Sequence, residues 1–333
     1  IIMEYDQKIL IIRFSSIGDI VLATSPLRTL RNTYPKSEIT FLTLDVYAPL
    51  LHYHPDIDVL ITLEKNSSIF TLFLYSKFIK QKNFNIIFDL HNSLRSKIVT
   101  IGSKNKVKKI SKPRMKRFLL FYLFLNKFNK LFSVPRMYHF FMKENLEDNK
   151  IVPKTFLKLS ENEINSSFSM LKSHGIKKPF FVIIPGAAWK QKCWNVNKYI
   201  QLIKKLDIPV VLLGSKSDFI CFDISRKIKS VINFAGKTDL REAMAILSNA
   251  YYVIGSDTGL THIAEALGKN VSMILGPTSS ETGANVILDK SKIIKKDIWC
   301  RPCSQNGKRK CYRTKQFCMD LISVNDVFQT IPK

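Results

Sequence analysis

The sequence has few acidic residues, few cysteines and no long hydrophobic run. Aspartate and glutamate number 26 against 52 lysines and arginines, which gives a formal net charge of +26 for 333 residues. An excess of this size bears on partners and association rates rather than on fold. It predicts an acidic partner, either nucleic acid, an anionic membrane face or a phosphorylated small molecule.

These scarcities exclude whole classes of protein. The longest purely apolar run, residues 118–125, is far shorter than the roughly 18 to 20 residues that span a bilayer. The six cysteines are too sparse for a disulfide scaffold. The stretch IIMEYDQKILIIRF lacks the basic segment, apolar stretch and cleavage site of a secretory signal. We therefore expect a cytoplasmic protein that is soluble or bound to a membrane surface.

Hydrophobic residues make up 46% of the chain, enough for two domains with separate cores. Apolar runs bounded by turn residues predict strands, and segments with apolar residues three and four apart, such as 199–206 and 241–249, predict helices between them. This alternation predicts an α/β fold with parallel sheets covered on both faces. The predicted strands are residues 9–14, 39–44, 85–90, 180–184, 210–213, 251–255 and 271–275.

The strand pattern is interrupted at residues 145–178. We therefore predict two Rossmann-like domains facing a central cleft, residues 1–165 and 178–320, followed by a C-terminal tail, residues 321–333. Ligands of such sheets bind beyond the carboxyl ends of the strands. The loops that follow the predicted strands are therefore the candidate site.

The first loop has one carboxylate at its tip. Ser15, Ser16 and Gly18 let the chain turn tightly and leave backbone N–H groups exposed at a helix N-terminus. Asp19 follows them. From these residues alone, the carboxylate either complements the helix dipole or carries chemistry.

The loop GSDTG follows another strand and opens another helix. Asp257 or Thr258 can cap that helix, and the open amides of Thr258, Gly259 and Leu260 could accept a phosphate. We expect His262, one turn further on, to pack or form a hydrogen bond rather than to catalyse.

Two more loops carry candidate binding residues. Lys190 and Lys192 lie between a strand and a helix; we expect Lys190 to be solvated, whereas Lys192 could neutralise a leaving diphosphate. Gly214 ends a strand, and Asp218 beyond it could accept hydrogen bonds from ribose hydroxyls.

Together and in this order, the four loops resemble those of glycosyltransferase family 9, the ADP-heptose:lipopolysaccharide heptosyltransferases. The resemblance implies a GT-B fold whose N-terminal domain mainly holds the acceptor and whose C-terminal domain holds the nucleotide sugar. It also implies transfer of a heptosyl group, with inversion, from an ADP-sugar donor to a lipopolysaccharide core acceptor, with no metal and no other cofactor. The resembling segments are ILIIRFSSIGDIVLATSPLRTLRNTYP, FDLHNSLRS, PGAAWKQKCW, FAGKTDLREAMAILSNAYYVIGSDTGLTHIAEALG and ILGPTSSETG.

The resemblance also implies a role for each candidate residue. By its position in the family motif, Asp19 would take the proton from the acceptor hydroxyl. Lys192 would pair with the diphosphate, and Asp218, where family members often have glutamate, would meet the ribose. The remaining roles are loop shaping and amide donation by Ser15, Ser16 and Gly18, orientation of the second loop by Asp257, and amide donation by Thr258 and Gly259.

Two acidic residues in HPDIDVL form a pattern that points to a different kind of site. Asp56 and Asp58 are spaced as in the motif that holds a metal-bound nucleotide sugar in the other large glycosyltransferase fold. Because they follow a helix-like segment and lead into residues 59–63, we interpret them as part of an ordinary connection.

Residues 104–117 carry eight basic side chains and no acidic one, and FLLFYLFLNKFNKLF follows at once. This segment is either a solvated loop that leads into a core helix or an element that lies on the anionic inner membrane. On the second hypothesis, Lys108, Lys109, Arg114 and Lys116 contact lipid headgroups, and the protein is peripherally associated with that membrane.

The C-terminal region has the spacing C-x2-C-x7-C-x6-C. The four thiolates could close a zinc site, form disulfides or remain reduced in the packing, and we favour the last. The four residues are Cys300, Cys303, Cys311 and Cys318.

Two other functions compete with the heptosyltransferase hypothesis. One is a family transferase with a different donor sugar. The other is a nucleic-acid-binding protein, which the net charge would suit. Because the basic cluster adjoins an apolar run rather than a recognisable reading helix, we expect no nucleic acid as a partner.

Overall fold

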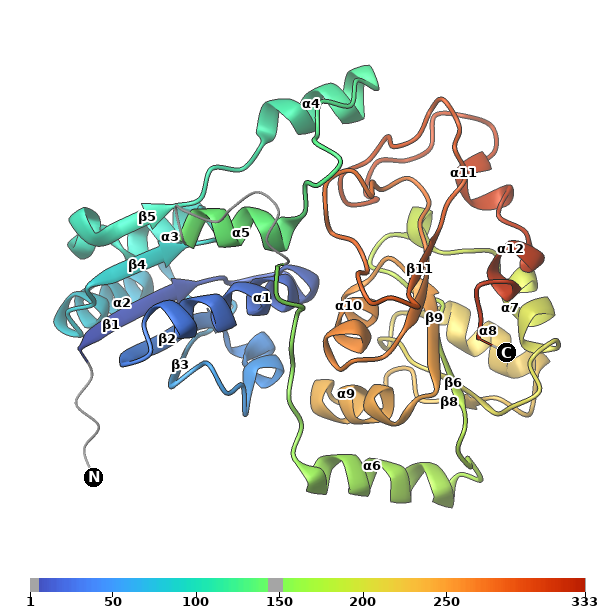
Figure 1. Ribbon diagram of the computed structural model, residues 1–333. Coiled ribbons are helices and arrows are strands. Elements are labelled where there is room, and N and C mark those ends of the chain that lie inside the picture. The colour runs from blue at the N-terminus through green and yellow to red at the C-terminus, as the bar shows by residue number, and fades with distance from the viewer. Residues whose placement is uncertain (1–5, 143–151, 333) are drawn as a thin grey trace. The chain divides into compact units, whose positions relative to one another are not determined.

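The computed structural model describes residues 6–142 and 152–332. Its contacts divide the chain into two compact units, each visible in Figure 1. The first unit comprises Ile1–Lys112 and Val134–Lys158, and the second comprises Pro113–Ser133 and Leu159–Lys333. The predicted domain limits at residues 165, 178 and 320 stay a prediction.

The first unit contains a five-stranded sheet in the order β3-β2-β1-β4-β5, with every neighbouring pair parallel. Leu10 and Ile12 of the central strand are fully buried against helices, which is why this strand is continuously apolar. The strands are β1 (Gln7–Ile12), β2 (Ser37–Leu44), β3 (Val59–Leu63), β4 (Ile86–Asp89) and β5 (Val107–Lys109). The helices are α1 (Ile17–Thr33), η1 (Asp45–Leu51), α2 (Ile69–Gln81), α3 (Leu94–Val99), η2 (Ile101–Lys106) and α5 (Val134–Met142).

The second unit contains a six-stranded parallel sheet in the order β11-β10-β9-β6-β7-β8. Trp194 and Tyr199 form the largest aromatic pair of its core, with ring centroids 5.0 Å apart. The strands are β6 (Phe181–Ile184), β7 (Val210–Leu212), β8 (Ile232–Asn233), β9 (Tyr252–Ser256), β10 (Val271–Ile274) and β11 (Lys292–Ile294). The helices are α4 (Arg114–Leu123), α6 (Glu161–Ser173), η3 (Lys190–Lys192), α7 (Val196–Ile203), α8 (Phe219–Lys227), α9 (Leu240–Asn249), α10 (Gly259–Ala266), α11 (Phe317–Asp320) and α12 (Val324–Phe328).

The α/β prediction is confirmed, and each of the seven predicted strands corresponds to a strand of the two sheets. The two predicted helices correspond to α7 and α9. The strands that the sequence did not reveal are β3, β5, β8 and β11, which all lie at sheet edges. Most of their residues are exposed or only partly buried, so they lack the continuously buried apolar run that marks a central strand.

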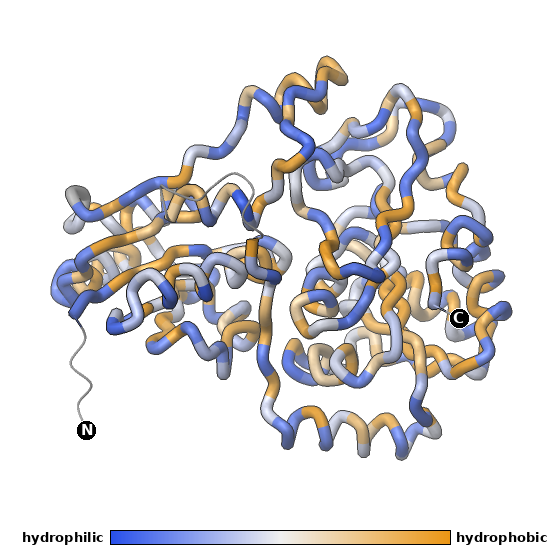
Figure 2. Tube along the Cα trace, in the orientation of Figure 1, coloured by the Kyte–Doolittle hydropathy of each residue, from blue (hydrophilic) through white to orange (hydrophobic). Residues whose placement is uncertain are grey.

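The basic segment at residues 104–117 is divided between the two units. Lys108 and Lys109 lie on the edge strand β5, whereas Arg114 and Lys116 lie in the first turn of α4, and all four are exposed. The first turn of α4 is mostly hydrophilic, and the remainder of the helix is mostly hydrophobic (Figure 2). Among the described residues, no helix is long and apolar enough to cross a bilayer.

Candidate active site

Asp19 lies in the first turn of α1, just beyond the carboxyl end of β1. Ser16 is the N-cap of this helix, and the two residues form a capping box. Asp19 Oδ2 accepts hydrogen bonds from Ser16 N at 3.2 Å and Ser16 Oγ at 3.0 Å. Capping is therefore one function of Asp19, but its side chain remains 41% exposed, so the carboxylate is open to a substrate.

Arg13, the residue that follows β1, holds the same carboxylate oxygen. Its Nη2 lies 2.7 Å from Asp19 Oδ2, and its Nη1 donates to the carbonyl of Leu90 at 2.8 Å. Burial would raise the pKa of Asp19, but the charge of Arg13 and the hydrogen bonds from Ser16 outweigh burial and lower it. Asp19 is therefore ionised at neutral pH.

The loop after β4 forms a second wall beside Arg13. Asp89 is fully buried and accepts the backbone N–H groups of His91 at 3.0 Å and Asn92 at 2.7 Å, which fixes the loop. The ring of His91 meets the ring of Phe14 edge-on, with centroids 5.3 Å apart. Burial and the nearby Arg13 and Lys112 charges lower the pKa of His91 to about 4, so its imidazole is neutral at physiological pH.

Neither Arg13 nor His91 was predicted as a site residue. Both lie in segments that carry the family resemblance, so the resemblance contained a signal for them. The sequence did not show that the Arg13 side chain forms an ion pair with the carboxylate of Asp19, six positions further along the chain.

In the second unit, Lys192 and Asp257 form an ion pair of 2.9 Å between Nζ and Oδ2. Thr278 Oγ1 donates to the same Oδ2 at 2.9 Å, and His262 Nε2 lies 3.8 Å from Oδ1. Burial would raise the pKa of Asp257, but His262 and Lys192 together lower it far below its ordinary value. The prediction that His262 interacts rather than catalyses fits this arrangement.

The first turn of α10 lies beside this ion pair. Thr258 is the N-cap, and Gly259 and Leu260 are the first helical residues. Amides at the start of a helix have no partner within the helix and attract anions. The structure thus brings Lys192 and the N-terminus of α10 together at the carboxyl end of β9. That a phosphate binds there stays a prediction.

Asp218 lines a pocket of about 650 Å³ at the carboxyl ends of β6 and β7. Its Oδ2 accepts hydrogen bonds from Ser215 N at 2.6 Å and Ser215 Oγ at 2.8 Å. It lies so close to Gly186 that a Cβ there would be 2.2 Å from Asp218 Oδ1. The carboxylate therefore shapes the loop as well as the pocket. Other residues lining the pocket are Lys190, Cys193, Asn195, Phe219, Asp223 and Gln316.

Asp56 and Asp58 are engaged within the first unit, in agreement with their interpretation as part of a connection. Asp58 Oδ2 accepts the backbone N–H of Ile39 at 2.7 Å and pairs with Arg31 at 2.5 Å. Asp56 is buried and pairs with Arg28 at 3.2 Å. Both carboxylates thus tie the connection to α1 and β2.

The four cysteines of the C-terminal region are free thiols. Cys300 and Cys318 are buried and accept hydrogen bonds from Arg313 at 3.6 Å and from Gln316 at 3.7 Å. Within residues 6–142 and 152–332, no three His, Cys, Asp or Glu side chains are grouped so that they could hold a metal ion.

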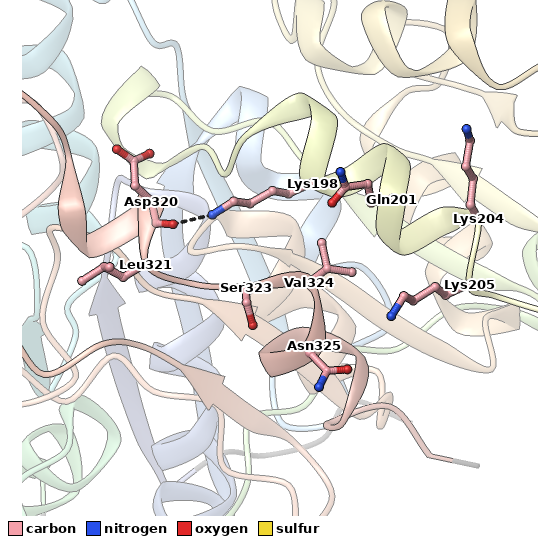
Figure 3. A pocket seen from close by; sticks show the side chains of 9 residues that line it. All are labelled: Lys198, Gln201, Lys204, Lys205, Asp320, Leu321, Ser323, Val324 and Asn325. Carbon is pink, nitrogen blue, oxygen red and sulfur yellow. Dashed lines mark hydrogen bonds between the residues drawn. The ribbon is translucent and has the colours of Figure 1, made fainter.

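A second pocket, of about 620 Å³, lies between α7 and α12 (Figure 3). Lys198 crosses it and donates from Nζ to the carbonyls of Asp320 at 2.5 Å and Ile322 at 2.8 Å. None of the predicted site residues lines this pocket. Lys198 therefore links the C-terminal segment to α7.

Comparisons with known proteins identify the family of the chain. Residues 74–312 match the family model described as glycosyltransferase family 9 (heptosyltransferase). The chain is 27% identical over 293 residues to lipooligosaccharide heptosyltransferase 2 of Haemophilus ducreyi, covering 82% of this chain and 84% of that protein.

Solved structures show the same fold. The structure of Escherichia coli ADP-heptose lps heptosyltransferase II matches with a TM-score of 0.74 and 22% identity, over 97% of each chain. The iron-containing dodecameric glycosyltransferase TibC from enterotoxigenic E. coli matches with a TM-score of 0.60 and 15% identity, over 98% of this chain and 76% of that one. The α/β fold of the two parallel sheets is therefore the GT-B fold.

Proposed function

The chain belongs to glycosyltransferase family 9, and we propose that it transfers a heptosyl group from ADP-heptose to the inner core of lipopolysaccharide. The reaction is a single displacement with inversion that needs no metal, and it takes place at the cytoplasmic face of the inner membrane. The names of the relatives and the two sets of site residues support this proposal.

In the first unit, Asp19 acts as the general base. As the acceptor oxygen forms its bond to the anomeric carbon, its proton passes to Asp19, and the bond from that carbon to the diphosphate oxygen breaks with its electron pair on ADP. The donors described above all contact Oδ2, and we assign the proton to Oδ1. Arg13 is the positioning residue, since it holds the carboxylate in its charged form.

In the second unit, Lys192 and the first turn of α10 receive the charge that develops on the leaving diphosphate. Lys192 supplies a full positive charge, and the amides of Thr258, Gly259 and Leu260 supply hydrogen bonds. Asp257 keeps Lys192 at this helix end. The pocket beside Asp218 takes the nucleoside.

The observation that carries the proposal is the ionised, 41% exposed Asp19 carboxylate held by Arg13 at the carboxyl edge of a parallel sheet. The test is release of ADP from ADP-heptose in EDTA, with a panel of truncated core acceptors. Asp19→Asn, which keeps the shape of the side chain but removes its basic form, should lower acceptor-dependent release by about 10²- to 10⁴-fold.

The release assay, together with binding measurements for ADP and for RNA, separates the alternatives. Release that persists in Asp19→Asn would remove Asp19 from the chemistry. No release with any acceptor, from protein that still binds ADP, would point to another donor sugar or acceptor. Protein that binds RNA and not ADP would be the nucleic-acid-binding alternative.

A further inference from the structure

Helix α2 exposes a row of large apolar side chains in the first unit. Its inner face, with Leu72 and Ile79, is buried in the core. Its outer face carries Ile69 and Phe70, which are 64% and 69% exposed. Three further residues of the outer face, Phe73, Leu74 and Phe78, are also exposed.

The apolar surface continues beyond α2. Helix α2 packs against α3 and η2, and Gly102 N donates to Ser76 Oγ at 3.3 Å. Leu94, the first residue of α3, is 75% exposed, and Ile101 of η2 is exposed as well. We call the seven residues the α2 face, namely Ile69, Phe70, Phe73, Leu74, Phe78, Leu94 and Ile101. Large exposed apolar side chains that gather on neighbouring elements mark an interaction site.

The charges around the α2 face are mostly basic. Between Lys65 and Lys143 the one acidic residue in the sequence is Asp89, and it is fully buried. Two exposed carboxylates, those of Asp45 and Glu64, lie near the helix on the side of Lys65, whose backbone N–H donates to Asp45 Oδ1 at 3.0 Å. Lys77, Lys80 and Lys97 are exposed on α2 and α3. The stem of Lys80 lies against Gly102, and a lysine at a membrane interface buries such a stem while its charged end stays in water.

The α2 face is most exposed at the edge of the sheet that carries Asp19. Because β1, β3 and β4 are parallel, the segments that follow them begin at the same edge. Ile69 and Phe70 begin α2 after β3, and Leu94 begins α3 after β4. Arg95 Nη2 donates to the carbonyl of Lys65 at 3.1 Å and so links the first turn of α3 to the segment that leads into α2.

We propose that the α2 face docks the enzyme on an anionic lipid bilayer. The apolar side chains enter the boundary between headgroups and acyl chains, and Lys77, Lys80 and Lys97 contact the anionic headgroups. The purpose of this docking rests on the proposed function, because a docked enzyme would meet a bilayer-held acceptor at the sheet edge where Asp19 lies. Charge complementarity selects the occupant. The exposed lysines of α2 and α3 outnumber the exposed acids Asp45 and Glu64 beside them, and a rim with an excess of positive charge fits an anionic surface.

Vesicle flotation of the full-length protein tests this surface. The probes are vesicles of phosphatidylcholine alone and of phosphatidylcholine mixed with phosphatidylglycerol. Phe70→Gln/Phe73→Gln should bind the mixed vesicles about tenfold more weakly than the native protein. Lys77→Gln/Lys80→Gln should lose a similar factor on mixed vesicles and change little on the neutral ones.

The comparison variant is Phe118→Gln/Tyr122→Gln on α4, the helix that carries Arg114 and Lys116 of the membrane hypothesis drawn from the sequence, so it sets that surface against the α2 face. These two rings are also exposed and are stacked with centroids 5.2 Å apart, so their loss removes similar apolar surface. Equal melting temperatures of the variants and the native protein establish that all are folded. Equal vesicle binding by the α2 variant and the native protein, or loss of binding in the α4 variant instead, would overturn the proposal. So would a dimer of the native protein that the α2 substitutions disperse without any vesicle binding.

An activity assay separates this inference from the proposed function. With a water-soluble truncated acceptor, Phe70→Gln/Phe73→Gln should match the native rate. With the same core acceptor anchored in mixed vesicles, the variant should be about tenfold slower. Vesicle binding that depends on the α2 face without transfer to either acceptor would refute the function and leave the docking surface. Equal rates of the variant and the native protein on both acceptors would refute the docking surface alone.

Discussion

Arg13 Nη2 and Asp19 Oδ2 lie 2.7 Å apart, joining the end of β1 to the first turn of α1. Arg13 is almost completely buried, whereas Asp19 is partly open to solvent. The buried Arg13 therefore holds the accessible negative charge of Asp19 in a fixed position. A charge held in this way is the property that a general base requires before the substrate arrives.

Arg13→Gln should move the acid limb of the pH profile of kcat/KM to higher pH. Arg13 lowers the pKa of Asp19 against the effect of burial, so its loss raises that pKa, and the basic form is lost at a higher pH as the solution is acidified. Arg13→Lys keeps the charge and should shift the limb less. Normalised profiles of native and Arg13→Gln enzyme that superimpose would assign Arg13 to structure alone.

Lys192→Met should reduce transfer by about 10²-fold or more, because it removes the charge that faces the leaving diphosphate. Lys190→Met is the comparison, since Lys190 belongs to the same short helix η3 but lines the pocket beside Asp218. Its loss should weaken binding of the nucleoside and lower transfer less than the loss of Lys192. Steady-state kinetics with ADP-heptose and isothermal titration with ADP measure both variants. Equal losses in the two variants would mean that general positive charge matters and the Asp257 contact does not.

Much of the fold was readable from the sequence because a central parallel strand is buried on both faces and is therefore continuously apolar. The predicted run at residues 9–14 shares residues 9–12 with strand β1, Gln7–Ile12, for this reason. The edge strands were not predicted because they are partly exposed to solvent and so lack a continuous apolar run. Strand β8, with Ile232 and Asn233 both half-buried, has no alternation long enough to detect.

The sequence predicted which positions the candidate site residues occupy better than it predicted which side chains they contact. A Ser-Gly loop before a helix indicates an anion site or a cap, and both Asp19 and Thr258 lie where that pattern put them. Which partner each side chain selects depends on residues that are remote in the chain. Thr278 lies 21 positions from Asp257, and a pattern within one loop cannot show that contact.

Transfer should proceed unchanged in EDTA and should not increase on addition of Mg²⁺ or Fe²⁺. Lys192 and the α10 amides take the place of a cation at the diphosphate. The check is the rate before and after chelation, together with metal analysis of the purified protein. The control is Cys300→Ser/Cys303→Ser, which should show the same insensitivity. A rate that is lost in EDTA and restored by one metal would refute metal independence, and loss of that response in the control would assign the metal to the cysteines.

Glu163→Gln should destabilise the second unit at neutral pH and much less in acid. Arg241 holds the carboxylate through two hydrogen bonds of 2.7 Å, and this contact lowers the pKa of Glu163 to about 2 despite partial burial. The stabilisation is complete above the ordinary pKa of glutamate and disappears as the pH falls from about 4.5 to about 2. Because the pair is partly exposed, the loss at pH 7 should be about 1–2 kcal/mol. Urea unfolding at pH 7 and pH 3 measures it, and an equal loss at both values would contradict the assignment.

Gly307→Ala should weaken binding of the donor although Gly307 lies in the cysteine-rich segment. A Cβ at this position would be 2.5 Å from Cγ of Lys192, so the lysine must move away from Asp257 and from the helix N-terminus. Gly268→Ala is the matched control, because Gly268 has a φ of +79° against +84° for Gly307 but has nothing within 4 Å of the added carbon. Both variants should lose a similar stability of about 1 kcal/mol from the left-handed backbone. Only Gly307→Ala should raise the Kd for ADP and the KM for ADP-heptose, by about tenfold. If both variants bind ADP as the native protein does, Lys192 is not held in place by this segment.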